Sequence, residues 1–359
     1  MTPARWPRPS AEAEQLMVVD ATSGAVQVTT LASLADILSP GDLFVVNDAA
    51  TLPGLLPAKT VDGRAIELRI ARIDFPRIRA IALGDGPTFA PTESRGAPPD
   101  LGRGGILEIA GGVRAEVVGS AHGGRLLDLD VRGDAAGFWR AVYAYGRPIQ
   151  YSYVERPLSL YHVQTAFASR PWAAEMPSAG RPITWRALGA LRKKGVGIAR
   201  VTHGAGLSST GSDALDACLP FVEKYEIGTE AAKAIADTRR LGGRIVAAGT
   251  TVVRALESAV RAGDGEVLAG RGDAALVLDD KTPRLVVDVV LTGIHEAGTS
   301  HHRLLSAFAP SSALDGALAA AEAHGFLLHE FGDSMLVVAS PRVPLRDVTA
   351  RERSATIAA

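Results

Sequence analysis

The segment Gly242–Ser258, GGRIVAAGTTVVRALES, constrains the fold of this chain more than any other segment. Its first part, Arg244–Ala248, is a short apolar run with β-branched residues, which is typical of a buried strand. Gly249-Thr250-Thr251 then interrupts the run, and apolar residues recur at helical spacing from Val252 to Ala259. A strand, a tight turn and a helix in this order predict a βα unit of a parallel sheet.

The turn between this strand and this helix also predicts a ligand site. The first amides of a helix have no partner within the helix, and they attract carboxylates and phosphates. The hydroxyls of Thr250 and Thr251 add further polar groups at this turn. An ordinary βα turn without a ligand is the alternative, and it is the commoner case in parallel sheets.

Two kinds of pattern alternate along the chain. Residues 1–60 and 150–359 have an α/β pattern, whereas residues 61–149 contain short alternating runs separated by glycine and proline. The sequence therefore predicts an α/β main domain, discontinuous in sequence, with an inserted small antiparallel β-barrel domain. Asp213 and Ser312 are expected helix N-caps. The expected helices cover residues 184–194, 213–222, 229–241, 252–262 and 311–324, and the expected strands cover 43–46, 197–202, 244–248, 275–278, 285–291 and 334–339.

Composition excludes several classes of protein. With 359 residues and 47% apolar content the chain can bury a large core, and 38 basic against 39 acidic residues leave a net charge of −1. Contact with nucleic acid would therefore need a local basic patch. Cys218 is the only cysteine, which excludes a disulfide framework and a cysteine-based zinc site. No signal peptide or membrane-spanning run is found, so we expect a soluble cytoplasmic protein.

The sharpest cluster of polar residues lies at 291–308. The expected strand 285–291 leads to His295, and Thr299 and Ser300 open a helix carrying His301 and His302. Polar groups beyond the carboxyl end of a strand lie where α/β folds bind ligands. His295 is therefore either a candidate site residue or a loop histidine that makes one backbone hydrogen bond. His301 and His302 are predicted to be surface residues on the first turn of the helix. A zinc site made of His203, His295 and His301 lacks a carboxylate at a metalloprotease spacing, so we expect no metal.

Four further segments offer candidate ligand contacts. The long stretch 153–185 contains Gln164 and Thr165 and the small-residue turn Met176–Gly180, or it is a connecting loop. His203 follows a strand and precedes two glycines, a weak cradle signal. Glu223 lies in a polar run. Asp333 lies in a turn, where its carboxylate either caps the turn or contacts a ligand.

In order along the chain, these segments resemble the S-adenosylmethionine:tRNA ribosyltransferase-isomerase family of the queuosine pathway. The family's GGRVIAVGTTSxRxLES is matched almost fully by Gly242–Ser258, and TNFHLPKSTLLMLVSAF aligns without gaps on Thr292–Phe308. Weaker echoes are GDLLVxNDTRVIPARL at Gly41–Leu56, YQTVYA at Tyr161–Ala168, APTAGLHFT at Met176–Thr184, HVGxGTF at His203–Ser209, MHSExYxI at Phe221–Ile227 and SYGDAML at Glu330–Leu336.

The chain also departs from the family's pattern. RDxSRLLV is absent near Ala11–Val18, Phe221 stands for the histidine of MHSE, and the Pro-Lys-Ser-Thr stretch reads Ala297–Ser300. Several lost residues are basic or aromatic, the types that hold an anticodon loop. The pattern indicates a diverged member whose cofactor site is better preserved than its tRNA site.

The resemblance implies a reaction. Family members move the ribosyl moiety of S-adenosylmethionine to 7-aminomethyl-7-deazaguanine in tRNA, giving epoxyqueuosine with release of adenine and methionine, and they need no metal. It implies S-adenosylmethionine as co-substrate and tRNA as partner. The alternatives are a diverged paralogue with a small-molecule acceptor and a non-catalytic ligand-binding relative. The catalytic candidates are His295 and Glu223, and the substrate-binding candidates are Gln164, Thr165, Ala179, Gly180, His203, Gly249, Thr250, Thr251, Arg254, Thr292, Thr299, Ser300 and Asp333.

Overall fold

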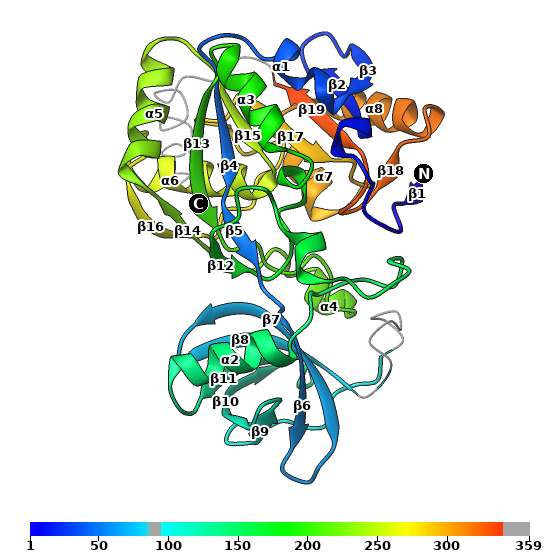
Figure 1. Cartoon of the computed structure of the whole chain (residues 1–359), viewed down its shortest axis with the longest axis vertical. Coiled ribbons are helices and arrows are strands. Elements are labelled where there is room, and N and C mark those ends of the chain that lie inside the picture. The colour runs from blue at the N-terminus through cyan, green and yellow to red at the C-terminus, as the bar shows by residue number, and fades with distance from the viewer. Residues whose placement is uncertain (85, 87–94, 340–359) are drawn as a thin grey trace, which may run out of the picture.

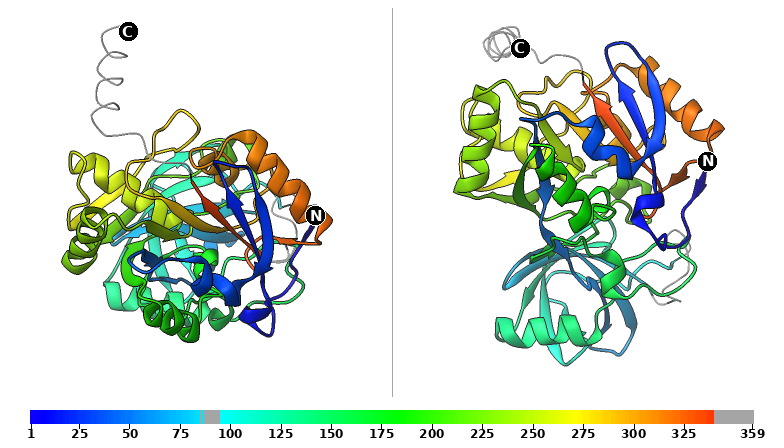
Figure 2. Two further views of the ribbon diagram at one scale, coloured as in Figure 1. Left: turned by 90° about the horizontal axis from the view of Figure 1, so that it is seen from above. Right: turned by 45° about the horizontal axis from the view of Figure 1, so that its top comes forward.

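The computed structural model describes residues 1–84, 86 and 95–339. A nine-stranded mixed sheet and a closed six-stranded antiparallel barrel dominate the architecture. The barrel lies at one end of the sheet domain in Figure 1 and in the right-hand view of Figure 2. These features confirm the predicted fold class, an α/β main domain with an inserted β-barrel.

The large sheet combines a parallel centre with antiparallel pairs on both sides. The strands β13, β4, β15 and β17 are parallel neighbours, and β19 and β2 form another parallel pair. The parallel centre brings the carboxyl ends of β4, β15 and β17 to one edge. In spatial order the strands are β16 (Gly270–Ala274), β14 (Glu223–Ile227), β13 (Gly197–His203), β4 (Leu43–Asn47), β15 (Ile245–Ala248), β17 (Val289–Gly293), β19 (Ser334–Val338), β2 (Gln15–Asp20) and β3 (Val26–Thr30).

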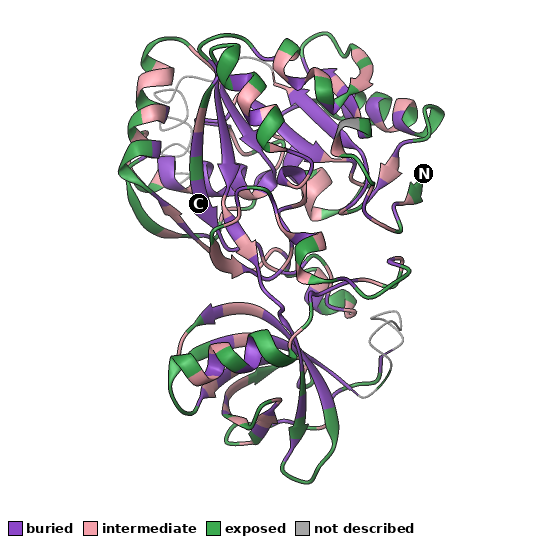
Figure 3. Cartoon of the chain, viewed as in Figure 1, coloured by how far each residue is buried: buried purple, intermediate pink, exposed green. Residues whose placement is uncertain are grey.

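Both faces of this sheet are covered, as its uninterrupted apolar strands require. On β4, Leu43 and Val45 belong to one core cluster, whereas Phe44 and Val46 belong to another. Helices α5 (Thr229–Arg240), α6 (Thr250–Ala262) and α8 (Ser311–Ala323) contribute to the first cluster, and α1 (Leu34–Ile37) and α3 (Trp185–Lys193) contribute to the second. Figure 3 shows the strands between them as almost entirely buried.

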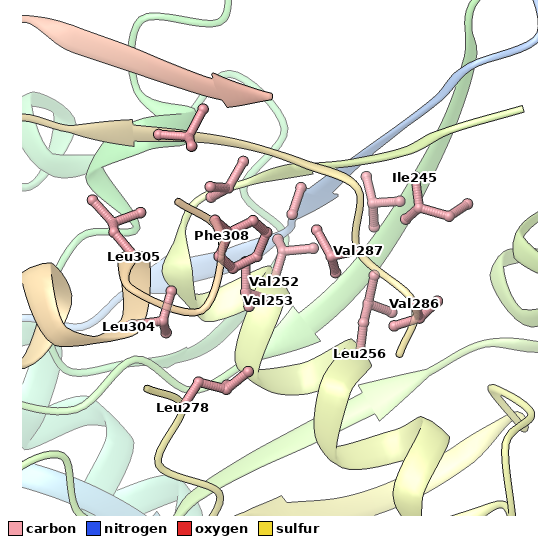
Figure 4. Close-up of a cluster of buried hydrophobic side chains, with 14 of the residues drawn as sticks. Ile245, Val252, Val253, Leu256, Leu278, Val286, Val287, Leu304, Leu305 and Phe308 are labelled. Atoms are coloured by element: carbon pink, nitrogen blue, oxygen red, sulfur yellow. The ribbon is translucent and has the colours of Figure 1, made fainter. Parts of the chain in front are cut away.

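Helix α6 is the most deeply packed helix beside the predicted site. Its Val252, Val253 and Leu256 are completely buried. They lie in the same cluster as Phe308 and as Leu304 of α7 (Ser300–Leu305), as Figure 4 shows. Because α6 and α7 share this core, the turn before α6 and the histidines of α7 are held in one rigid arrangement.

The interior of the barrel is filled by apolar side chains. All neighbouring barrel strands are antiparallel, and β9 closes the ring by pairing with both β6 and β10. Interior side chains such as Leu68, Ile70 and Leu129 have no exposed surface, and Phe138 of α2 (Ala135–Tyr145) packs among them. The strands are β6 (Leu55–Thr60), β7 (Ala65–Asp74), β8 (Arg77–Leu83), β9 (Ile106–Ile109), β10 (Val113–Ala121) and β11 (Leu126–Val131).

A separate apolar cluster joins the barrel to the loops of the main domain. It contains Leu55, Ile81 and Leu83 of the barrel together with Leu207 and Leu215. Leu215 belongs to α4 (Asp213–Asp216), which Figure 1 shows beside the junction. The junction therefore supports the loops that follow β13.

Several elements differ from the expected bounds. The helix expected over 213–222 ends at Asp216, and Pro220, which has no amide hydrogen to continue a helix, follows. The strand expected at 275–278 is wrong, because β16 ends at Ala274 and residues 275–278 form no strand. The strand expected at 285–291 is β17, which spans Val289–Gly293. Helix α6 begins at Thr250, two residues earlier than expected, because Gly249 is its N-cap. The N-caps of α4 and α8 are Ser212 and Pro310, not Asp213 and Ser312.

Short elements complete the described chain. In that part of the chain, no helix is both long enough and apolar enough to cross a membrane. The remaining strands are β1 (Thr2–Pro3), β5 (Ala49–Thr51), β12 (Arg170–Ala173) and β18 (Leu327–Leu328), and the 3-10 helices are η1 (Ala11–Ala13), η2 (Leu31–Ser33), η4 (Leu160–Val163) and η5 (Ser178–Gly180).

Candidate active site

The turn before α6 has the geometry of an open helix N-terminus. Gly249 has φ of 102° and ψ of 154°, a region that only glycine adopts readily, and no side chain caps the helix. The Gly249 amide donates to the carbonyl of Leu291 on β17 at 2.8 Å, which ties the turn to the neighbouring strand. The amide of Val252 donates to the carbonyl of Gly249 at 3.1 Å, whereas the amides of Thr250 and Thr251 receive no side-chain cap and can bind a ligand.

Residues from distant parts of the sequence line one cavity at this turn. It brings together many predicted site residues from the strand ends and from α6 and α7. They are Ala179, Glu223, Gly249, Thr250, Thr251, Arg254, Thr292, His295 and Ser300. The sequence had assigned His301 to the surface, which is wrong: its side chain lines this cavity too.

A second, larger cavity adjoins the first. The two share residues that include Glu175, Ser208, His295 and His301. The larger cavity also contains the predicted residue Thr299 and has a volume of about 600 Å3. Small-molecule sites typically have volumes of roughly 300–1,000 Å3, so this space suits a ligand of nucleoside size.

His295 lies where the two cavities meet. It follows β17, and its Nε2 lies 2.8 Å from the hydroxyl oxygen of Thr292. The centroids of the His295 and His301 rings are 4.6 Å apart. Burial lowers the pKa of His295 well below its usual value, and positive charge on His301, His302 or His329 would lower that pKa further. Burial and the charge of Arg254 lower the pKa of His301 to about 4. Both rings are therefore neutral at pH 7.

Glu223 on β14 is buried against two other predicted site residues. Its carboxylate lies 3.2 Å from Nε of Arg254 and 3.4 Å from Nε2 of His203, and it accepts the amide of Gly206. Burial raises the pKa of Glu223, while the charge of Arg254 opposes that rise. His203 is completely buried, and burial lowers its pKa to about 3, so its contact with Glu223 involves a neutral imidazole.

Asp333 holds three segments together. Its carboxylate accepts the amide of Gln15 at 2.9 Å, the amide of Leu327 at 2.8 Å and the guanidinium of Arg8 at 2.6 Å. It also lines a third, small cavity together with Ala179. These bonds join the starts of β2 and β18, which is the turn-organising alternative stated above for this carboxylate.

Four predicted residues lie away from these three cavities. The side-chain amide of Gln164 exchanges two hydrogen bonds with the backbone of Thr51, at 3.0 and 2.9 Å. Gly180 packs so closely that a Cβ there would lie 3.0 Å from the ring of Phe167 and 3.2 Å from the methyl group of Thr165. With His203, these residues support the site walls, and their predicted ligand contacts stay predictions.

An acidic and aromatic wall of the larger cavity was not predicted from the sequence. Glu175 accepts hydrogen bonds from the Tyr151 hydroxyl, from the Ser208 amide at 3.0 Å and from the Ser208 hydroxyl at 2.8 Å. Burial raises the pKa of Glu175 to about 7. The one available signal was its place directly before the small-residue turn Met176–Gly180.

No metal centre is found where the structure can be described. Within residues 1–84, 86 and 95–339, no group of three or more His, Cys, Asp or Glu side chains could hold a metal ion. His295 and His301 approach one another, whereas His203 contacts Glu223.

Comparisons with known proteins agree with this architecture. The fold is similar to the crystal structure of S-adenosylmethionine tRNA ribosyltransferase from Thermotoga maritima, with a TM-score of 0.51 and 22% sequence identity. The similarity covers 94% of this chain and 96% of that chain, and at this identity it concerns the fold. The family model described as "Queuosine biosynthesis protein" matches residues 2–337, so the chain belongs to that family, as its sequence motifs predicted.

Proposed function

We propose that this chain is an S-adenosylmethionine:tRNA ribosyltransferase-isomerase. It would transfer the ribosyl moiety of S-adenosylmethionine to 7-aminomethyl-7-deazaguanine in tRNA, giving epoxyqueuosine and releasing adenine and methionine. The observation that supports this most is that the open N-terminus of α6 and His295 line one cavity in a chain of the queuosine biosynthesis family.

The turn before α6 suits the methionine end of S-adenosylmethionine. A carboxylate placed there would accept the free amides of the first turn and gain from the helix dipole. Thr250 and Thr251 line the same space, and the side-chain amide of Asn47 holds the Thr251 hydroxyl at 3.3 Å. We assign the recognition of this carboxylate to the amides and hydroxyls of Thr250 and Thr251, with Gly249 shaping the turn that exposes them.

His295 is the proposed general base. The sulfonium of S-adenosylmethionine acidifies the neighbouring C5′ hydrogens, so a neutral imidazole can remove one of them. If Nε2–H donates to the Thr292 hydroxyl, Nδ1 carries the free lone pair, and this tautomer is the one that can accept the proton. The imidazolium that forms has a lowered pKa and is a good acid, so it can protonate adenine as it departs.

Glu223 is the proposed orienting group. It lines the first cavity, and its contacts with Arg254 and Gly206 fix the position of its carboxylate. From there the carboxylate would accept a hydrogen bond from a ribose hydroxyl or from the incoming amine. Arg254 is held by the carbonyl of Ala274 at 2.6 Å, so this arrangement is rigid.

Mass spectrometry of small molecules tests the proposal. The protein is incubated with S-adenosylmethionine, with and without tRNA carrying 7-aminomethyl-7-deazaguanine, and with His295→Ala as a matched control. Release of adenine and methionine only with that tRNA supports the proposal. Release without tRNA identifies a diverged enzyme with another acceptor. No release in either mixture contradicts the proposed activity.

A gel shift with the same tRNA separates these outcomes further. Lysine and arginine contacts to phosphates displace counterions, so tRNA binding should weaken as salt increases. Binding of S-adenosylmethionine without turnover and without a tRNA shift would indicate the non-catalytic relative.

A further inference from the structure

Two tyrosine–carboxylate pairs form one wall of the larger cavity. The Tyr151 hydroxyl donates to Glu175, and the Tyr153 hydroxyl donates to Glu330. The two tyrosine rings are stacked, with centroids 6.0 Å apart and an interplanar angle of 21°. Burial raises the pKa of both phenols, so both hydroxyls stay protonated and act as donors.

His329 extends this wall. Its ring stacks on Tyr153, with centroids 4.3 Å apart and an interplanar angle of 13°. It also has φ of 68°, a left-handed conformation that is uncommon for a residue other than glycine. Backbone strain of this kind persists where the surroundings hold the residue for a purpose. Three rings are thus stacked in a row, and the hydroxyls of the two tyrosines bind the carboxylates of Glu175 and Glu330.

The charges around the cavity favour a positively charged ligand. Among the described residues that line it, the carboxylates belong to Glu175, Asp216, Glu296 and Glu330, whereas the one guanidinium is the exposed Arg303. The carboxylate of Asp216 is committed to Ser209 and Thr210. Burial raises the pKa of Glu175 to about 7, and a bound cation would favour its ionised form, so the cavity has an excess of negative charge toward a cation.

The carboxylate of Glu175 also has room for another partner. Its Oε1 accepts from Tyr151 and from the Ser208 amide, whereas Oε2 accepts from the Ser208 hydroxyl. A carboxylate oxygen offers two lone-pair directions, so Oε2 can receive one more donor or cation.

We propose that Tyr151, Glu175, Tyr153 and Glu330 form a subsite for an onium cation, either the sulfonium of S-adenosylmethionine or the protonated amine of the acceptor base. The identity of the ligand rests on the proposed function, whereas the charge preference rests on the wall itself. The carboxylates attract such a cation by Coulomb interaction and accept charge-assisted hydrogen bonds from it, while the two tyrosine hydroxyls hold the carboxylates in place.

Binding of two matched ligands tests the sulfonium. S-adenosylmethionine and S-adenosylhomocysteine differ by one methyl group and by the positive charge. Isothermal titration should show that the protein prefers the cation and that Glu175→Gln or Glu330→Gln weakens S-adenosylmethionine binding by about tenfold, the scale of one charge-assisted contact. S-adenosylhomocysteine binding should be unchanged, which also shows that the variants are folded. Glu155→Gln is the matched control, because Glu155 is exposed and pairs with Arg5 at 3.3 Å.

A second arm tests the amine. RNA stem-loops with 7-aminomethyl-7-deazaguanine or plain guanine at the same position are titrated onto the same variants. If Glu175→Gln weakens binding of only the amine-bearing stem-loop, the amine is the cation. If neither ligand pair shows a charge preference that depends on Glu175 or Glu330, the subsite is wrong.

Failure of the proposed function has a different signature. Charge-selective binding would then persist without release of adenine. Tyr151→Phe and Tyr153→Phe keep the rings and remove the hydrogen bonds to the carboxylates. They should therefore retain most of the charge preference, whereas a purely structural wall would lose the binding of both ligands together.

Discussion

The hydroxyl oxygen of Thr292 lies 2.8 Å from Nε2 of His295. Thr292 belongs to β17, and His295 lies just beyond its end, so the strand itself orients the imidazole. Both residues line the cavity at the start of α6. The contact decides which ring nitrogen faces away from the strand, and Nδ1 can take a proton there when Nε2–H donates to Thr292.

His295→Ala should lower kcat by roughly 10²–10⁴, the range typical of a general base. Thr292→Val should lower kcat by a smaller factor, about tenfold, because the ring stays but loses its orientation. Activity of the wild type should fall as the pH falls through the lowered pKa of His295, which lies below the usual value near 6.5. His324→Ala, at an exposed position on the last turn of α8, is the control, and unchanged turnover in His295→Ala would remove the assignment.

Gly249→Ala should destabilise the protein and weaken S-adenosylmethionine binding. At φ of 102° and ψ of 154° an alanine costs about 1–3 kcal/mol, and its Cβ would lie 3.5 Å from that of Ala179 at the cavity wall. Gly189→Ala in α3 is the matched control, because an added Cβ there meets nothing within 4 Å. That control should be neutral or stabilising in urea unfolding, and equal effects at both glycines would contradict the special role of Gly249.

Glu257→Ala should be one of the most destabilising single changes in the main domain. Glu257 is completely buried on α6, and its carboxylate accepts the amides of Leu285, Val286 and Val287 and pairs with Arg261 at 2.9 Å. Removing it leaves buried amides and a guanidinium without this acceptor, a loss of about 3–5 kcal/mol. Glu257→Gln should lose less, since one acceptor oxygen remains. Urea unfolding that finds both variants as stable as the wild type would contradict this account.

Glu14→Gln should flatten the pH dependence of stability. Burial raises the pKa of Glu14 from 4.5 to about 7, while the Ser334 hydroxyl donates to its carboxylate at 2.6 Å. The folded state therefore holds a proton that the unfolded state has released. The resulting stabilisation is fully present below pH 4.5 and is lost as the pH rises through about 7.

The measurement for Glu14 is the free energy of unfolding between pH 4 and pH 9. The variant should remove roughly a few kcal/mol from the change in this free energy over the range, while Glu175, whose pKa is also raised to about 7, still adds a contribution of the same sign. His203 and His301, whose pKa values are lowered to about 3 and 4, add contributions of the opposite sign below about pH 6.5. Glu108→Gln, at an exposed ion pair with Lys59 in the barrel, should leave the slope unchanged. A slope in Glu14→Gln equal to that of the wild type would show that Glu14 is ionised in the folded state.

The sequence by itself determined the architecture and the turn before α6. Apolar periodicity and turn residues are local signals, and they predicted β4, β15, α5, α6 and the antiparallel barrel. The predicted helix bounds were wrong where a single residue determines the end of a helix, as at Pro220 beyond α4 and at Gly249 before α6. The motif at 292–308 also placed His295 correctly beyond a strand end.

Only the tertiary structure decided which side chains meet. Glu175, Tyr151 and Ser208 lie far apart in sequence, and loop packing against the barrel brings them to one cavity wall. Contacts between other distant segments join the side chain of Gln164 to the backbone of Thr51 and bury His203 beside Glu223. Local propensity determines which segments form helices and strands. The contacts and protonation states of the site residues depend on burial and on hydrogen bonds between distant segments, so no single segment determines them.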